Sequence, residues 1–201
     1  QFDAVCERAS VLVAEFPGAV AVHNILAAAS ASAGRLEQAA HAFRHVLSLK
    51  PSYADGHNNL GKVLTGLGQI EEALVQFERT VELNPAHVEA HCNRGNALMS
   101  LGRLEESGAS FGEALRIDAT SALAHTGQGK AFKRLGRLDE ALHSFELALE
   151  HHPTSAEHVG NVAGVLRASG RLDEAIRQFT LALELSPGSA GAHNNLGNAL
   201  R

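Results

Sequence analysis

The sequence predicts an all-α solenoid, in which helix–turn–helix units of 34 residues stack along one axis. Columns of matching residues recur with this period. Glycines form the first column: Gly34, Gly68, Gly102, Gly136 and Gly170. All five prolines form the second, with Ala119 filling its one gap: Pro17, Pro51, Pro85, Pro153 and Pro187. Phenylalanines form the third: Phe43, Phe77, Phe111, Phe145 and Phe179. Independent columns in one register indicate repeats that each contact mainly their neighbours.

The segment from Ala54 to His87 shows how one unit is built. Residues 55–67 carry apolar or small side chains at helical spacing, which predicts a first helix. Gly68 follows where a helix end favours a residue with positive φ. Apolar spacing predicts a second helix over residues 70–83. This helix ends before Pro85, because the residue preceding a proline is disfavoured in the α region.

Acidic pairs recur at the start of the second helices: Glu71-Glu72, Glu105-Glu106, Asp139-Glu140 and Asp173-Glu174. Negative charge in the first turn complements the helix dipole and contributes about 0.3–1 kcal/mol per site. We therefore assign these carboxylates a structural role and not a catalytic one.

The motifs of this unit resemble the tetratricopeptide repeat, with Leu60-Gly61 in the first helix, Ala73 and Phe77 in the second, and a closing Pro85. The resemblance implies a right-handed superhelix whose first helices line a concave groove. It covers the chain as a single solenoid, 1–201, with these units: 1–19 (partial), 20–53, 54–87, 88–121, 122–155, 156–189 and 190–201 (partial). Histidines replace the family's aromatic residue near the start of the first helix, and we expect them to form local hydrogen bonds: His23, His57, His91, His125 and His193.

Composition and spacing exclude several functions. A net charge of −5 argues against general nucleic-acid binding, and no apolar run approaches the length of a membrane span. The histidine column cannot share one metal ion, because equivalent helices stand about 8–10 Å apart. His41 and His45 have helical i, i+4 spacing but no evident third ligand, and Cys6 and Cys92 are isolated. We expect no metal, no cofactor and no enzymatic activity.

Polar side chains on the first helices are the candidate binding residues. One column holds Asn59, Asn93, Asn161 and Asn195 and is interrupted by Ile25 and Gly127. Three residues further along lie Lys62, Asn96, Lys130 and Asn198, with Ala28 and Gly164 as exceptions. A further step of three reaches Lys133, Arg167 and Arg201. Steps of three keep the columns on one helix face.

Asparagine amides offer one acceptor and two donors, so a row of them can hold successive peptide groups of an extended chain. The segments 57–61 and 193–198 resemble repeats of the superhelix in O-linked N-acetylglucosamine transferase-like proteins. That resemblance implies an asparagine ladder that holds a substrate peptide. The cations Lys130, Lys133 and Arg134 cluster in one unit and, facing the groove, would favour an acidic or phosphorylated segment. The predicted function is therefore a non-catalytic scaffold that binds a protein or an extended peptide in its concave groove.

Two alternatives remain open at this point. The repeats could be the substrate-recruiting arm of a larger enzyme, such as a glycosyltransferase or a sulfotransferase. They could also be a self-assembly module, because half units at both ends would leave complementary faces for end-to-end stacking.

Overall fold

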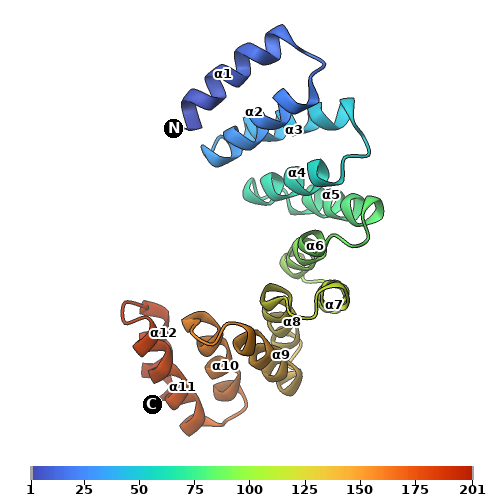
Figure 1. The fold of residues 1–201 in the computed structure, drawn as a ribbon. Helices are drawn as coiled ribbons and strands as arrows, with labels where there is room; N and C mark the ends of the chain where they lie inside the picture. Colours follow the sequence, from blue (N-terminus) through green and yellow to red (C-terminus); the bar gives the residue numbers. More distant parts are fainter. Residues whose placement is uncertain (1, 201) are drawn as a thin grey trace. The chain divides into compact units, whose positions relative to one another are not determined.

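The computed structural model describes residues 2–200, and their side chains from residue 4 onward, as twelve helices with no strand (Figure 1). The all-α prediction is confirmed. The helices are α1 (Phe2–Glu15), α2 (Val20–Ser32), α3 (Leu36–Leu49), α4 (Ala54–Gly66), α5 (Ile70–Leu83), α6 (Val88–Ser100), α7 (Leu104–Ile117), α8 (Ala122–Arg134), α9 (Leu138–His151), α10 (Ala156–Ala168), α11 (Leu172–Leu185) and α12 (Ala190–Ala199). None of these helices is long and apolar enough to cross a membrane.

Consecutive helices pack as antiparallel hairpins, as α4 does with α5 and α8 with α9. The second helix of a hairpin also packs against the next first helix, as α5 does with α6 and α9 with α10. Within each unit, a second helix thus buries one face against its own partner and another against the following first helix. This pattern of neighbouring contacts is typical of a solenoid.

The glycine column forms the turns inside the hairpins. All five glycines have a φ of 75–77°, the left-handed conformation that glycine adopts without a Cβ penalty. At Gly68, the preceding helix closes with a bond from the backbone N–H of Gln69 to the carbonyl of Leu64 at 2.9 Å. The positive φ predicted for this position is confirmed.

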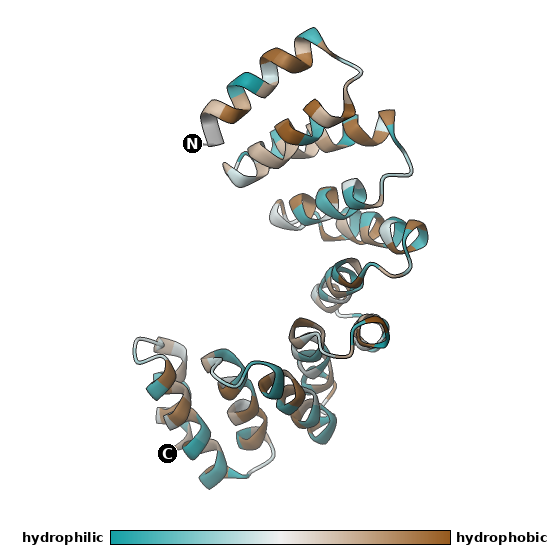
Figure 2. Ribbon diagram, in the orientation of Figure 1, coloured by the Kyte–Doolittle hydropathy of each residue, from teal (hydrophilic) through white to brown (hydrophobic). Residues whose placement is uncertain are grey.

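The phenylalanine column supplies the largest buried side chains, and each of the five rings is at most 2% exposed. The Phe77 ring lies against the bare backbone of Gly61, where a Cβ would come within 2.5 Å of the ring. Phe145 packs in the same way against Gly129, with a corresponding distance of 2.8 Å. Hydrophilic and hydrophobic stretches alternate along the helices (Figure 2), as amphipathic packing requires.

The first-helix histidines form the local hydrogen bonds that the sequence predicts. In each case Nε2 lies 2.9–3.0 Å from the carbonyl oxygen of the residue six positions earlier, which is the proline of the column or Ala119. Because a carbonyl only accepts, Nε2 carries the proton. These bonds tie the start of each first helix to the preceding turn.

The acidic residues lie in the first turns of the second helices, as expected. The structure adds a partner that the dipole interpretation did not include. The arginine preceding the helix bonds to the second acidic residue at i+3, in the pairs Arg103–Glu106, Arg137–Glu140 and Arg171–Glu174. The carboxylates therefore have both a helix dipole and a cation to interact with.

Contacts between Cα atoms divide the fold into two compact units, with the boundary between Leu101 and Gly102. Unit 1 contains α1 to α6, and unit 2 contains α7 to α12. The boundary falls inside the predicted repeat 88–121.

Candidate functional site

Two hollows lie between successive first helices of unit 1. The first has a volume of about 360 Å³ and lies between α2 and α4. Asn59 and Lys62 line its α4 side, Ala28 lines its α2 side, and the Phe43 ring contributes an apolar surface. Two of the predicted binding residues thus share one concavity with an aromatic side chain.

The second hollow repeats the first, displaced by one unit. It has a volume of about 170 Å³ and lies between α4 and α6. Its lining residues Phe77, Asn93 and Asn96 stand 34 positions after Phe43, Asn59 and Lys62. We call these two concavities the repeat hollows. Their spacing follows the repeat, so they offer the same chemistry at regular intervals.

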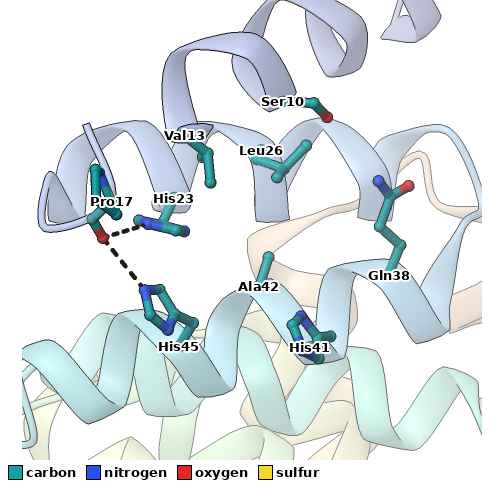
Figure 3. A pocket seen from close by; sticks show the side chains of 9 residues that line it. All are labelled: Ser10, Val13, Pro17, His23, Leu26, Gln38, His41, Ala42 and His45. Atoms are coloured by element: carbon teal, nitrogen blue, oxygen red, sulfur yellow. Dashed lines mark hydrogen bonds between the residues drawn. The ribbon is translucent and has the colours of Figure 1, made fainter. Parts of the chain in front are cut away.

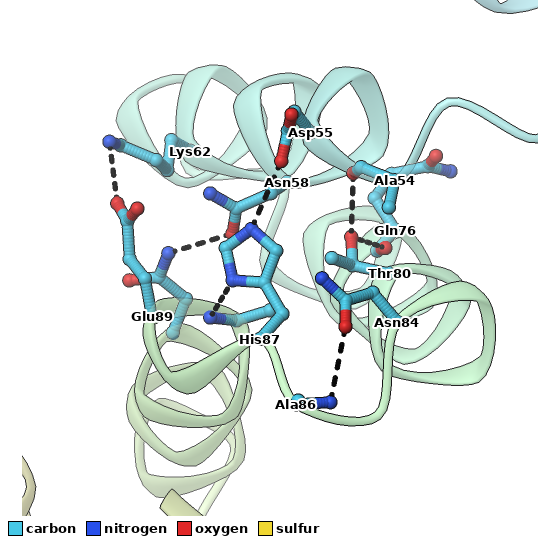
Figure 4. Close-up of polar contacts among 12 residues, drawn as sticks. Ala54, Asp55, Asn58, Lys62, Gln76, Thr80, Asn84, Ala86, His87 and Glu89 are labelled. Carbon is cyan, nitrogen blue, oxygen red and sulfur yellow. Dashed lines mark hydrogen bonds and ion pairs between the residues drawn. The ribbon is translucent and has the colours of Figure 1, made fainter. Parts of the chain in front are cut away.

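A polar network borders the second hollow and joins α4 to α6 (Figure 4). Asn93 Nδ2 donates to Asn58 Oδ1 at 3.0 Å, and Lys62 Nζ lies 2.8 Å from Glu89 Oε1. The hydrogen bond from Lys62 holds the pKa of Glu89 below its usual value, and Asn58 acts in the same direction. Asn58 is 3% exposed, whereas Asn59 is half-buried. The Asn93 amide therefore already donates one hydrogen bond within the protein. The Asn59 side chain makes no hydrogen bond with the described residues.

Unit 2 places the remaining candidates on α8, α10 and α12. Lys130 Nζ lies 3.2 Å from Glu157 Oε1, which repeats the Lys62–Glu89 pairing of unit 1. Asn161 is half-buried, and its Nδ2 is shielded without a hydrogen-bond partner among the described residues. Asn195 is half-buried and Asn198 is exposed.

The gap in the asparagine column at Gly127 has a packing cause. A Cβ at this position would lie 2.2 Å from the Phe111 ring, which is fully buried. The ring occupies the space that an asparagine side chain would need. The interruption is therefore built into the core of unit 2.

The third column brings two cations together at the ends of α8 and α10. Lys133 Nζ lies 3.1 Å from the position of a Cβ on Gly164, so the Lys133 side chain reaches across to α10. Arg167 follows Gly164 by three residues on the same helix. Arg201, the third member of this column, lies outside the described residues.

The histidines at the start of the chain line a separate, mostly apolar hollow between α1, α2 and α3 (Figure 3). His23 and His45 both donate to the Pro17 carbonyl, at 2.9 and 3.3 Å, and their ring centroids are 4.1 Å apart. The His41 side chain lies one turn away on α3 and lines the same hollow. His45 is thus engaged in a local bond.

Sequence reasoning did not identify two features of this region. The phenylalanine column marks the repeat in the sequence, but its spacing does not show that Phe43 and Phe77 line the repeat hollows. Asn58 was not singled out, although it bonds to a predicted ladder residue. The adjacent asparagines at 58 and 59 were the available signal, because neighbouring positions on a helix point in different directions.

The repeated helical hairpins and their hollows agree with sequence comparison. The profile of the tetratricopeptide repeat matches residues 58–122, 126–190 and 166–201, which together make up well over half of the chain. The chain belongs to the tetratricopeptide repeat family. No curated protein sequence matches this tetratricopeptide repeat chain significantly.

Solved tetratricopeptide repeat structures share the fold. MamA superposes with a TM-score of 0.75 at 20% identity, over 84% of this chain and 92% of MamA. YrrB, described as a TPR protein with an unusual peptide-binding site, has a TM-score of 0.74 at 20% identity, over 94% and 97% of the two chains. TTC0263, a thermophilic TPR protein of Thermus thermophilus, has a TM-score of 0.72 at 24% identity, over 90% and 99%. At these identities the similarity establishes the fold alone.

Proposed function

We propose that this tetratricopeptide repeat protein is a non-catalytic scaffold that binds an extended peptide segment along its first helices. The observation that carries the proposal is the pair of repeat hollows, which place Asn59 and Asn96 beside the Phe43 and Phe77 rings. Each hollow pairs a polar amide with an apolar ring, and an extended peptide likewise alternates polar backbone groups with side chains. Regularly spaced hollows would therefore accept successive segments of one extended chain.

The chemistry of each hollow suits peptide binding. An asparagine amide can donate to a peptide carbonyl and accept from a peptide N–H. The Phe43 and Phe77 rings are already almost fully buried, so the gain at this apolar surface comes from the ligand: an apolar side chain placed there loses its own hydration, at about 25 cal/mol per Å² removed from water. In unit 2, the shielded Nδ2 of Asn161 has no partner, and a ligand carbonyl would supply one after a side-chain rotation. The other members of the proposed ladder are Asn93, Asn195 and Asn198, with Lys62, Lys130 and Lys133 beside them.

The test is selection of random displayed peptides by the wild-type chain and by the double variant Asn59→Ala/Asn96→Ala. These two side chains make no hydrogen bond with the described residues, so their removal leaves internal contacts intact. Gln69→Ala removes an exposed amide from the turn before α5, which has no capping bond, and serves as the matched control. We expect enrichment with the wild type and the control and its loss with the double variant. Equal enrichment by all three would overturn the proposal.

The same groove chemistry would serve a substrate-recruiting arm of a glycosyltransferase or sulfotransferase. In that arrangement the peptide held by the asparagines would be the substrate of a catalytic domain elsewhere in a longer protein. A peptide selected as above would become modified only when such a domain is joined to the repeats.

End-to-end self-association is a second candidate function, favoured by exposed apolar side chains on and just after α1. Val11 and Phe16 are 60% and 55% exposed. The exposed side chains of α12 include the polar His193, Asn194 and Asn198, and the apolar Leu200 just after this helix is 66% exposed. Sedimentation velocity over a range of concentrations tests this proposal. A concentration-dependent increase in mass that Val11→Glu abolishes would support it, and a monomer at all concentrations would exclude it.

A further inference from the structure

We propose that Lys133 and Arg167 form a binding site for a phosphorylated peptide side chain at the ends of α8 and α10. The inference rests on the proposed peptide-binding function and gives it a chemical specificity. Both residues belong to unit 2, on successive first helices.

The geometry brings two positive charges together without a negative one. The Lys133 ammonium lies over the bare backbone of Gly164, within 3.1 Å of where its Cβ would be, and Arg167 follows one turn later. Among residues 4–200, neither side chain has an acidic partner, and no carboxylate acts on the Lys133 charge. Elsewhere on the same helices, Lys130 is paired with Glu157.

The environment of Lys133 reflects this shortage of negative charge. Burial lowers the pKa of its ammonium, and the neighbouring Arg167 guanidinium lowers it further. An anion bound between the two would offset their repulsion and stabilise the charged form of Lys133.

Helix dipoles explain only part of the arrangement. Cations in a last helical turn are stabilised by the partial negative charge there. However, α2, α4 and α6 have no basic residue in their last turns. The dipole also gives no reason for Lys133 to extend across Gly164 toward a second cation.

A phosphomonoester fits this site better than a carboxylate does. It carries a charge of about −1.5 to −2 and three acceptor oxygens, whereas a carboxylate carries a single charge. Two cations can each donate to a different phosphate oxygen, and arginine can do so through two N–H groups. Gly164 lets the Lys133 ammonium approach α10 because it has no side chain there.

The experiment uses the four lysines of the chain, Lys50, Lys62, Lys130 and Lys133, labelled with ¹³C at Cε and observed by NMR. Inorganic phosphate and a short phosphoserine peptide are titrated separately, with the glutamate form of the peptide as comparison. We expect the Lys133 signal to respond first and to show a rise in its pKa. The phosphoserine peptide should bind more tightly than free phosphate if the groove contributes contacts.

Two variants and one control test the assignment. Arg167→Gln should weaken the response about tenfold, the effect of losing one charge-assisted contact. Gly164→Asp supplies an internal carboxylate and should abolish the response. Arg177→Gln, an exposed arginine on α11, should leave the response unchanged.

The outcomes separate this inference from the proposed function. A Lys133 response to phosphate that persists in Asn59→Ala/Asn96→Ala supports the anion site whether or not peptide selection succeeds. Equal responses of all four lysines, or tighter binding of the glutamate peptide, would overturn the phosphate site while leaving the peptide groove untouched.

Discussion

Asn93 donates its Nδ2 hydrogen to Asn58 Oδ1 at 3.0 Å and so links α6 to α4. Asn58 also lowers the pKa of Glu89, as does Lys62, whose Nζ lies 2.8 Å from Glu89 Oε1. Asn59, the next residue along α4, points into a repeat hollow. Two adjacent asparagines therefore have different roles, one joining neighbouring repeats and the other facing the proposed ligand.

Replacing Asn58 by alanine should destabilise the protein by about 1–2 kcal/mol, because it removes the hydrogen bond from Asn93 and leaves the Asn93 amide without its acceptor. The better helix propensity of alanine offsets only a few tenths of a kcal/mol of this loss. Urea denaturation followed by helical circular dichroism measures the change.

The neighbouring substitution is the control for this prediction. Asn59→Ala should change the free energy of unfolding by no more than about 0.5 kcal/mol, since Asn59 makes no hydrogen bond with the described residues. Its effect should appear in peptide binding instead. Equal loss of stability in both variants would contradict the division of roles.

The helices and turns could be predicted from the sequence because each repeat places the same kinds of residue at the same positions. The glycine and proline columns mark the ends of helices, and the phenylalanine column marks the buried face. The observed α4 and α5, Ala54–Gly66 and Ile70–Leu83, differ from the predicted ranges by at most one residue.

The details of the candidate site could not be predicted, because they depend on contacts between repeats. The sequence does not show that Asn93 bonds to Asn58, since the two residues are 35 positions apart and lie in different columns. It likewise shows that Gly127 interrupts the ladder but not that the Phe111 ring fills the vacated space. Such contacts follow from how far helices approach, which residue spacing alone does not give.

Restoring the ladder at its gap should fail. Gly127→Asn places a Cβ 2.2 Å from the Phe111 ring, which is enclosed and cannot move aside without disturbing the core. Overpacking of this kind costs about 1–3 kcal/mol. We expect a lower urea midpoint.

Gly160→Ala in α10 is the control for that experiment, because Gly160 is also a glycine inside a helix. A Cβ there would meet nothing within 4 Å, so only helix propensity changes. We expect a gain in stability of about 0.5–1 kcal/mol. If Gly127→Asn stabilised the protein as well, the packing explanation for the gap would be wrong.

Acidification should weaken unit 2. Burial lowers the pKa of His125 and of His158, and the positive charges of nearby His151 and His152, respectively, act in the same direction. In the unfolded chain these imidazoles have a pKa of about 6.5, so they bind protons at a higher pH than in the folded protein. The unfolded state therefore gains stability as the pH falls through that value.

The measurement is the urea midpoint at about pH 7.5 and pH 5.5, with histidine NMR titration to assign the groups. We expect a lower midpoint at the acidic pH. His158→Gln should reduce this dependence, because it removes one of the two groups concerned. A midpoint that rises on acidification would show that the folded protein binds the protons more tightly, contrary to the burial of these rings.

The cation pair in unit 2 should reduce stability in the absence of a ligand. Among the side chains that the structure describes, none is an acidic partner of Lys133 or Arg167, so neutralising one of the two relieves repulsion and the burial of a charge. We expect Lys133→Gln to raise the free energy of unfolding by about 0.2–0.5 kcal/mol, the size of a like-charge interaction between exposed side chains. The gain should shrink at high salt, where the repulsion is screened. Arg177→Gln on α11 should show no such gain, and a loss of stability in Lys133→Gln would mean that the Lys133 ammonium is already compensated within the folded protein.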